Sequence, residues 1–185
     1  MSEPAIRCVK TPGRFLSLFL STMGAGFGMA RPGYRKAISR RFAERIMLAV
    51  SGVNRCAYCS WLHTRTALEK GLSQDEIRGL LEGSLGEVPE NETVAILYAQ
   101  HWSESEGRPS QEARQRVVDH YGRTTTAYIE RTIKTVTFGN LCSNTVCARR
   151  DNLLGEKPGL CFFLAYLLCL PVAFGIKKRA SPGNP

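Results

Sequence analysis

The residues best suited to chemistry lie in one short segment, Cys56-Ala-Tyr-Cys-Ser-Trp-Leu-His63. On an α-helix, Cys56, Cys59 and His63 would lie at about 0°, 300° and 340° around the axis, so they share one face. The thiolate is the reactive form of cysteine, and a neighbouring imidazole can take its proton or stabilise its charge. Cys56, one turn from Cys59, is placed to attack an oxidised Cys59 and close a disulfide. The pattern therefore favours thiol redox chemistry.

The same residue types allow two other interpretations. A C-x-x-C pair with a nearby histidine also supplies three zinc ligands, but no further C-x-x-C or H-x3-H pattern follows, so we predict no metal site. Cysteine is among the most frequently buried residues, so the two thiols and His63 would also suit a plain core. Both alternatives stay open beside the redox interpretation.

These residues must be held by helices. Apolar side chains recur at helical spacing from about Tyr34 onward, at Ile38, Phe42, Ile46, Ala49 and Val53. Asn54 is the expected N-cap of a second helix that runs through Lys70 and ends at Gly71.

The rest of the chain also indicates helices. Ser73 and Glu76 form a capping-box pattern, and Gly122 is expected to end the helix before it. Further helices are expected after Ser73, after Pro89, and over residues 110–121, 125–138 and 140–154. No alternating strand pattern with hairpin turns is present, so the predicted fold class is all-α.

Glu44 is the one carboxylate close upstream of the cysteines. It is in phase with Met47 and Ser51 rather than with the main apolar stripe, yet it precedes the apolar run 46–50. A carboxylate in such a place usually has a partner or a task.

The combined spacing from Glu44 to His63, E-x11-C-x-x-C-x3-H, resembles the carboxymuconolactone decarboxylase superfamily, and within it the alkylhydroperoxidase D-like (AhpD-like) branch. The strong match covers residues 36–82, including the Gly-Leu-Ser-Gln-Asp-Glu-Ile segment that begins at Gly71. A weaker echo lies at residues 138–145 and 154–158.

This resemblance implies an all-helical bundle that assembles as trimers or hexamers. It implies that Cys59 is the peroxidatic thiol, that Cys56 resolves it, and that His63 (the base) and Glu44 form a proton relay. Some family members have a histidine where this chain has Tyr58, whose phenol is a poorer proton carrier near neutral pH. No cofactor is implied.

Which thiol reacts first is also a physical question. Cys56 is expected at a helix N-terminus, where the macrodipole lowers a thiol pKa. His63 favours Cys59 instead, and a positioned imidazole accepts a proton outright, whereas the dipole only biases it. We therefore expect Cys59 to be the nucleophile.

Length and charge suggest one domain with appended segments. We expect a Gly- and Pro-punctuated, irregular or partly helical arm at 1–34, the family-like domain at 35–157, and an apolar helix with a basic tail at 158–185. The net charge is +9, and +8 of it falls in residues 1–55. That third has no aromatic interleaving and no nucleic-acid motif, so a solvated basic face is favoured over nucleic-acid binding.

Two uncharged apolar stretches, 15–30 and 160–176, bear on the compartment. Residues 15–30 could pass for a signal peptide, but their dense apolar part is short and small residues dilute the rest. Residues 160–176 fall just short of a membrane span, so a core or subunit-interface helix is favoured there, with peripheral membrane contact as the alternative. Seven cysteines are an odd number, which argues against a fully paired secreted scaffold and for a cytoplasmic protein.

The expected function is reduction of a hydroperoxide substrate, with a dithiol or protein reductant resetting the disulfide. One alternative is a disulfide oxidoreductase or decarboxylase-type enzyme of the same fold. Another is a non-catalytic, membrane-associated redox sensor.

Overall fold

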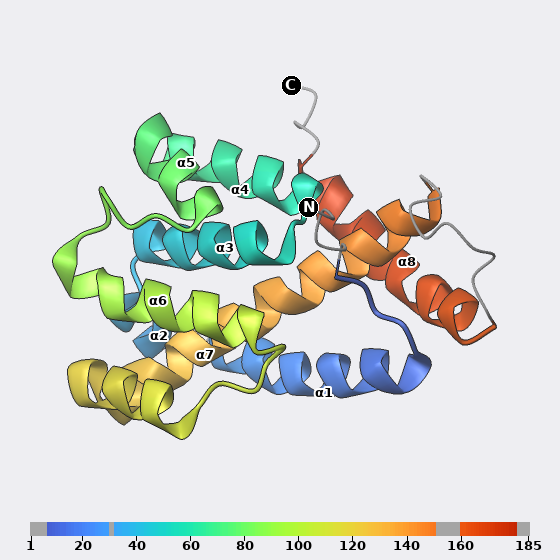
Figure 1. The fold of residues 1–185 in the computed structure, drawn as a ribbon, viewed down its shortest axis with the longest axis horizontal. Coiled ribbons are helices and arrows are strands. Elements are labelled where there is room, and N and C mark those ends of the chain that lie inside the picture. Colours follow the sequence, from blue (N-terminus) through green and yellow to red (C-terminus); the bar gives the residue numbers. More distant parts are fainter. Residues whose placement is uncertain (1–6, 30–31, 151–159, 181–185) are drawn as a thin grey trace, which may run out of the picture.

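The computed structural model describes residues 7–29, 32–150 and 160–180, and within these ranges the chain forms helices and no strand. The elements are α1 (Pro12–Met29), α2 (Pro32–Ala37), α3 (Arg40–Asn54), α4 (Ala57–Glu69), α5 (Gln74–Glu82), α6 (Glu90–Glu104), α7 (Gln111–Arg150) and α8 (Leu160–Ala180). The all-α prediction is confirmed, and the arrangement is that of a helical bundle (Figure 1).

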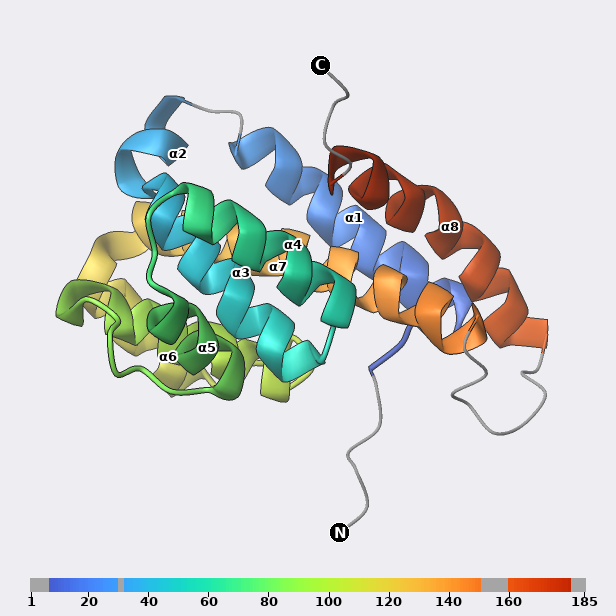
Figure 2. The same ribbon diagram turned by 90° about the horizontal axis from the view of Figure 1, so that it is seen from above.

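Helix α7 is the central element of the bundle. It packs against α1, α2, α3, α4, α6 and α8, and so it joins both ends of the molecule. Seen from above, α1 and α8 lie side by side at one end, whereas α3, α4, α5 and α6 gather at the other (Figure 2). The α3–α4 junction, which carries the cysteine pair, lies against the last third of α7, where Asn140 bonds Ser51 and Asn144 bonds the Asn54 carbonyl.

The helix expected to begin at Tyr34 is divided in two. α2 ends at Ala37, and Ser39 caps α3 by accepting a hydrogen bond from the Phe42 backbone N–H at 3.0 Å. A serine side chain competes well for these free N–H groups, so a cap is favoured there over a continued helix. The predicted stripe is otherwise correct, because Ile38, Phe42, Ile46 and Ala49 are all buried.

A buried ion network fixes α3 against α5 and α6. The Arg45 guanidinium lies 2.5 Å from the Glu76 carboxylate and 2.9 Å from that of Glu92. Ser73 caps α5 through the Glu76 N–H at 2.9 Å, as expected, but the Glu76 carboxylate bonds Arg45. In a full capping box the Glu76 carboxylate would accept a hydrogen bond from the Ser73 N–H. Here it pairs with Arg45 instead, because a buried guanidinium requires carboxylate partners.

Helix α3 also approaches α5 very closely at Gly52. A Cβ there would lie 2.4 Å from the backbone oxygen of Leu81, so only glycine fits this contact.

The later helices agree with the prediction at Gly122 and differ from it beyond that residue. Gly122 adopts φ 75°, and the chain kinks there, where the helix over 110–121 was expected to end. Beyond it the two helices expected at 125–138 and 140–154 are one, continuous to Arg150; residues 151–154 lie outside the described part of the chain. Gly139 does not break it because the helix on both sides is held by packing against α1, α3 and α8.

Two apolar clusters fill the bundle. The main cluster is formed by side chains of α2, α3, α4, α5, α6 and α7, and a second, smaller cluster lies between α1, α7 and α8. The second consists of Val9, Phe138, Leu141, Cys142, Ala165 and Cys169, with Phe15, Leu18, Val146 and Val172 packed against it. Much of the predicted 1–34 arm is thus the regular helix α1, docked on α7 and α8.

Over the described residues, none of the helices combines the length and the apolar content that a membrane crossing requires.

Candidate active site at the α3–α4 junction

The turn between α3 and α4 places both cysteines at one helix N-terminus. α3 continues through Asn54, and Arg55 then takes the left-handed conformation with φ 53°. Cys56 is the N-cap of α4, and its sulfur accepts a hydrogen bond from the Cys59 backbone N–H at 3.3 Å. The expected cap at Asn54 is wrong because Arg55 reverses the chain one residue later.

The two thiols are buried and bonded to each other. Cys56 is 1 % exposed and Cys59 is 2 % exposed, and neither is in a disulfide. A hydrogen bond from the Cys56 thiol holds the pKa of Cys59 below its ordinary value, against the effect of burial, and the Ser143 hydroxyl lowers it further. The same bond to Cys59, together with burial, raises the pKa of Cys56. Cys56 therefore keeps its proton, and Cys59 is the thiol poised to become a thiolate.

The α4 N-terminus acts partly against this asymmetry, because the Cys59 N–H donates to the Cys56 sulfur and that bond lowers the pKa of Cys56. The free N–H groups of the first turn carry partial positive charge and stabilise a thiolate placed there. Cys59 lies in that first turn, so the dipole that was expected to favour Cys56 acts beside Cys59 as well.

His63 and Glu44 form a pair on the adjoining faces of α4 and α3. Nδ1 of His63 lies 3.0 Å from Oε2 of Glu44, and both side chains are mostly buried. The carboxylate orients the imidazole and fixes which ring nitrogen faces away from it. The expected contact of His63 with Cys59 stays a prediction; the structure adds that Nδ1 of His63 is engaged by Glu44.

Tyr58 lies between the cysteines and a pocket. Its ring packs on Trp61 with centroids 6.0 Å apart, and its buried hydroxyl has no hydrogen-bond partner among the described residues. Burial and the nearby thiols raise its pKa, Cys59 before Cys56, so the phenol stays protonated and can donate. The pocket has a volume of about 230 Å³ and is lined by Tyr58, Ser143, Val146, Cys147, Arg150, Ala173 and Phe174.

Sequence reasoning missed the contribution of α7. The Asn144 side chain donates to the Asn54 carbonyl at 2.8 Å and to the Arg7 carbonyl at 3.0 Å. Asn140 bonds Ser51 of α3 at 3.3 Å, and the buried Ser143 hydroxyl has no hydrogen-bond partner among the described residues. The weak family echo at 138–145 covers all three α7 residues and is the signal that would have found them.

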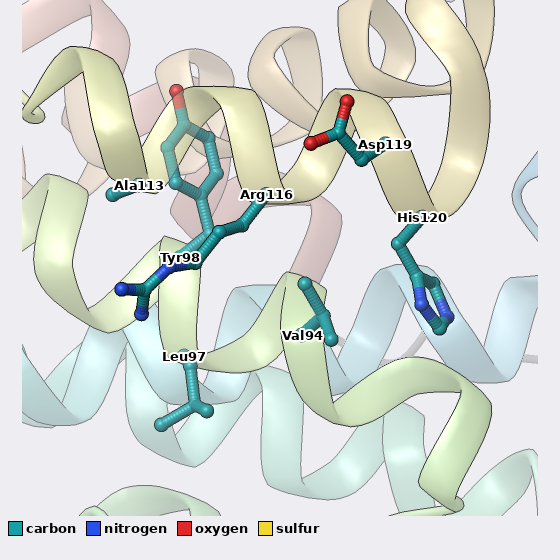
Figure 3. A pocket seen from close by; sticks show the side chains of 7 residues that line it. All are labelled: Val94, Leu97, Tyr98, Ala113, Arg116, Asp119 and His120. Atoms are coloured by element: carbon teal, nitrogen blue, oxygen red, sulfur yellow. The ribbon is translucent and has the colours of Figure 1, made fainter.

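A second hollow lies elsewhere, between α6 and the first part of α7. This open cleft of about 580 Å³ is lined by Val94, Leu97, Tyr98, Ala113, Arg116, Asp119 and His120 (Figure 3). It contains none of the residues predicted for the site. As for metals, the described residues contain no group of three or more His, Cys, Asp or Glu side chains arranged to hold an ion.

The chain is thus a helical-bundle protein with two neighbouring thiols at a helix N-terminus and a carboxylate–imidazole pair beside them. Residues 18–85 of this chain match the model of the carboxymuconolactone decarboxylase family. The match spans the last two-thirds of α1 and all of α2, α3, α4 and α5, and it confirms the resemblance seen in the sequence for that segment. No curated protein and no solved structure matches the chain.

Proposed function

We propose that this protein is a thiol-dependent peroxidase of the alkylhydroperoxidase-like type. The observation that carries the proposal is the placement of two buried thiols, neither in a disulfide, at the N-terminus of α4 beside the His63–Glu44 pair. A peroxidase cycle requires such a nucleophile with a resolving thiol next to it, and the lowered pKa of Cys59 favours Cys59 as the nucleophile.

The cycle takes place in four steps. A hydroperoxide enters the pocket beside Tyr58 and Ser143, and the Cys59 thiolate attacks the terminal peroxide oxygen. The O–O bond breaks, Cys59 becomes a sulfenic acid, and the alkoxide takes up a proton and leaves as an alcohol. The Cys56 sulfur then attacks the Cys59 sulfur, which forms the disulfide and releases water. An external dithiol small enough to reach the buried pair returns both electrons by disulfide exchange.

His63 and Glu44 serve this cycle as a proton relay. The carboxylate holds the imidazole from one side at 3.0 Å, so the other ring nitrogen is free to pass a proton between solvent and the thiol site. In our proposal His63 takes the proton from Cys56 as it resolves the sulfenic acid. The Tyr58 hydroxyl donates to the leaving alkoxide from the pocket side.

The burial of the sulfurs favours a small substrate over a protein disulfide. With 1 % and 2 % exposure, neither Cys56 nor Cys59 offers a surface that a folded protein disulfide can contact. A peroxide group on an apolar chain fits the pocket, most of whose lining is carbon from Val146, Ala173 and Phe174. A disulfide oxidoreductase or a decarboxylase-type enzyme is the alternative, and activity on a lipoyl-type disulfide with hydroperoxide ignored would select it.

The decisive experiment follows consumption of an organic hydroperoxide by the reduced chain, with mapping of the disulfide formed. Peroxide loss with formation of a Cys56–Cys59 disulfide supports the proposal. Thiols that stay reduced while peroxide persists would end it.

We further propose that a second copy of the chain covers the apolar face of α1 and α8. Apolar side chains are exposed there in a number unusual for an isolated surface: Leu16, Leu20, Met23, Leu160, Phe163, Leu164, Leu167, Leu168 and Phe174. Light scattering should give a multiple of the 20.5 kDa chain mass. A monomer that sediments with anionic vesicles would instead support the membrane-associated alternative. A cycle that must be re-reduced and an odd number of cysteines fit a cytoplasmic setting.

A further inference from the structure

A polar pocket of about 690 Å³ opens where the C-terminal ends of α3, α5 and α6 meet the segment before α1. Its lining includes Arg7, Gly52, Arg55, Glu82, Gln100 and Glu104. One wall is closely packed, because Gly52 is the residue at which α3 approaches the Leu81 backbone. None of the residues assigned to the peroxidase cycle lines this pocket, so its polar groups need another explanation.

Gln100 supplies a buried donor to this pocket. Its side chain is 8 % exposed, and its amide nitrogen is buried without a hydrogen-bond partner among the described residues. A buried amide N–H that lacks an acceptor is unfavourable, and such groups in folded proteins nearly always have one. Because Gln100 lines the pocket, an acceptor oxygen of a bound molecule would complete the hydrogen bond.

Two guanidinium groups of the lining favour an anionic group on that molecule. Arg7 is fixed at both ends, since its side chain donates to the Ser103 carbonyl and its own carbonyl accepts from Asn144 at 3.0 Å. The Asn144 side chain also donates to the Asn54 carbonyl at 2.8 Å, which fixes the turn that carries Arg55. Both arginines therefore stand on one hydrogen-bonded frame, and guanidinium groups are well suited to a carboxylate.

The opposite charge is present in the same pocket. Glu82 and Glu104 are exposed and are the last residues of α5 and α6, where the helix C-termini add partial negative charge. Two arginines and two glutamates leave the lining neutral overall. A phosphate group would be repelled by the glutamates and a simple cation by the arginines, whereas a zwitterion finds a partner for each of its charges.

We propose that this pocket binds a small zwitterion of the amino-acid type. Its carboxylate lies on the two arginines and the Gln100 amide, and its ammonium group lies on the two glutamates. The inference goes beyond the proposed function and does not depend on it, because the site shares no residue with the peroxidase cycle.

The test is calorimetric titration of the reduced, full-length chain with each of the standard L-amino acids, and with acetate and inorganic phosphate as anion probes. We expect at least one amino acid to bind at one site per chain with a Kd below about 1 mM, and both anions to bind more weakly. The N-acetyl and amide derivatives of that amino acid lack one charge each. They should bind about ten-fold more weakly or worse.

Substitutions locate the binding in this pocket. Gln100→Met keeps the length of the side chain and removes the amide donor, and Arg55→Gln removes one guanidinium at an exposed position. Each should weaken binding about ten-fold. Glu104→Gln should reduce the preference for the free amino acid over its N-acetyl derivative. Arg78→Gln, the same change at an exposed position on α5 outside the pocket, is the matched control and should bind normally.

Three results would overturn the inference. They are no amino acid bound at up to about 10 mM, binding unchanged in both Gln100→Met and Arg55→Gln, and phosphate or acetate bound as tightly as any amino acid. Should Gln100→Met fail to fold, Arg55→Gln decides alone, because its side chain is exposed. The titration uses no hydroperoxide, so a negative result leaves the peroxidase proposal standing, and an inactive peroxidase leaves this inference standing.

Discussion

Two pairs of thiols, Cys56 with Cys59 and Cys142 with Cys169, are built alike but lie in different surroundings. In each, one thiol donates to the other, so one pKa rises and its partner's falls. In each, a hydroxyl of α7 stands beside the low-pKa sulfur: Ser143 beside Cys59, and Thr145 beside Cys169. The hydrogen bond between thiols thus sets which sulfur is the nucleophile in both.

What differs is access to protons and to small molecules. The first pair lies at the α4 N-terminus, next to the His63–Glu44 pair and close to a pocket that reaches Tyr58 and Ser143. The second lies in a cluster made chiefly of carbon. A thiolate pair can therefore be prepared by local hydrogen bonds alone, whereas catalysis on a substrate also requires a proton route and an entrance.

The largest effect should come from removing the nucleophile of the first pair. Cys59→Ser is expected to lower hydroperoxide turnover by about 10³-fold or more, since a hydroxyl at this position is not ionised near neutral pH. Peroxide consumption measured with a coupled dithiol checks this. Cys161→Ser, at an exposed position on α8, is the control and should turn over normally. Equal rates for Cys59→Ser and the unaltered chain would remove the difference between the pairs.

Next in size is the proton relay. Glu44→Gln keeps the volume and a hydrogen bond to His63 but removes the charge that orients and supports a protonated imidazole, so turnover should fall by about 10²-fold. Steady-state consumption of an organic hydroperoxide measures the rate. Glu69→Gln, the same change at an exposed position on α4, is the matched control. A Glu44→Gln enzyme with an unaltered rate would mean that the relay plays no part.

A smaller effect is expected from cutting the hydrogen bond between the thiols. Cys56→Ala removes the largest cause that lowers the pKa of Cys59, so this pKa should rise and the thiolate should appear only at higher pH. At neutral pH, alkylation of Cys59 by iodoacetamide should slow by a factor of about ten. Thiolate absorbance followed across pH gives the titration directly. A Cys59 pKa that falls on this substitution would contradict the assignment of donor and acceptor.

The smallest and most selective effects should come from the two α7 hydroxyls. Ser143→Ala should raise the pKa of Cys59 and slow its alkylation by a factor of about five, with the second pair unaffected. Thr145→Val should instead raise the pKa of Cys169 and leave the alkylation of Cys59 unchanged.

The Thr145 change carries a cost that must be measured separately. The Val9 backbone N–H donates to the Thr145 hydroxyl at 2.8 Å, so its loss should lower the free energy of unfolding by about 1–3 kcal/mol. Urea denaturation of both variants measures it. If each substitution alters both thiol pairs equally, the hydroxyls do not act locally as described.

Much of the first site was predictable because it is local. Cys56, Cys59 and His63 share one helical turn or its neighbour, and the spacing to Glu44 is a motif that can be seen without coordinates. The all-helical fold, the buried stripe of α3, the cap at Ser73 and the kink at Gly122 follow from side-chain periodicity and glycine backbone freedom. The cap at Cys56 was missed, and Asn54 predicted in its place, because the turn at Arg55 depends on a left-handed conformation that no glycine indicates.

The sequence by itself determined the helices, the C-x-x-C pair and the residues that could serve it, because these depend on contacts a few positions apart. Only the tertiary structure decided that His63 bonds Glu44, that Ser143 stands beside Cys59, and that Cys142 meets Cys169. Such contacts join residues 19 to 84 positions apart, that is 63 − 44 at the least and 143 − 59 at the most. Their partners are chosen by how whole helices pack, which no local spacing encodes.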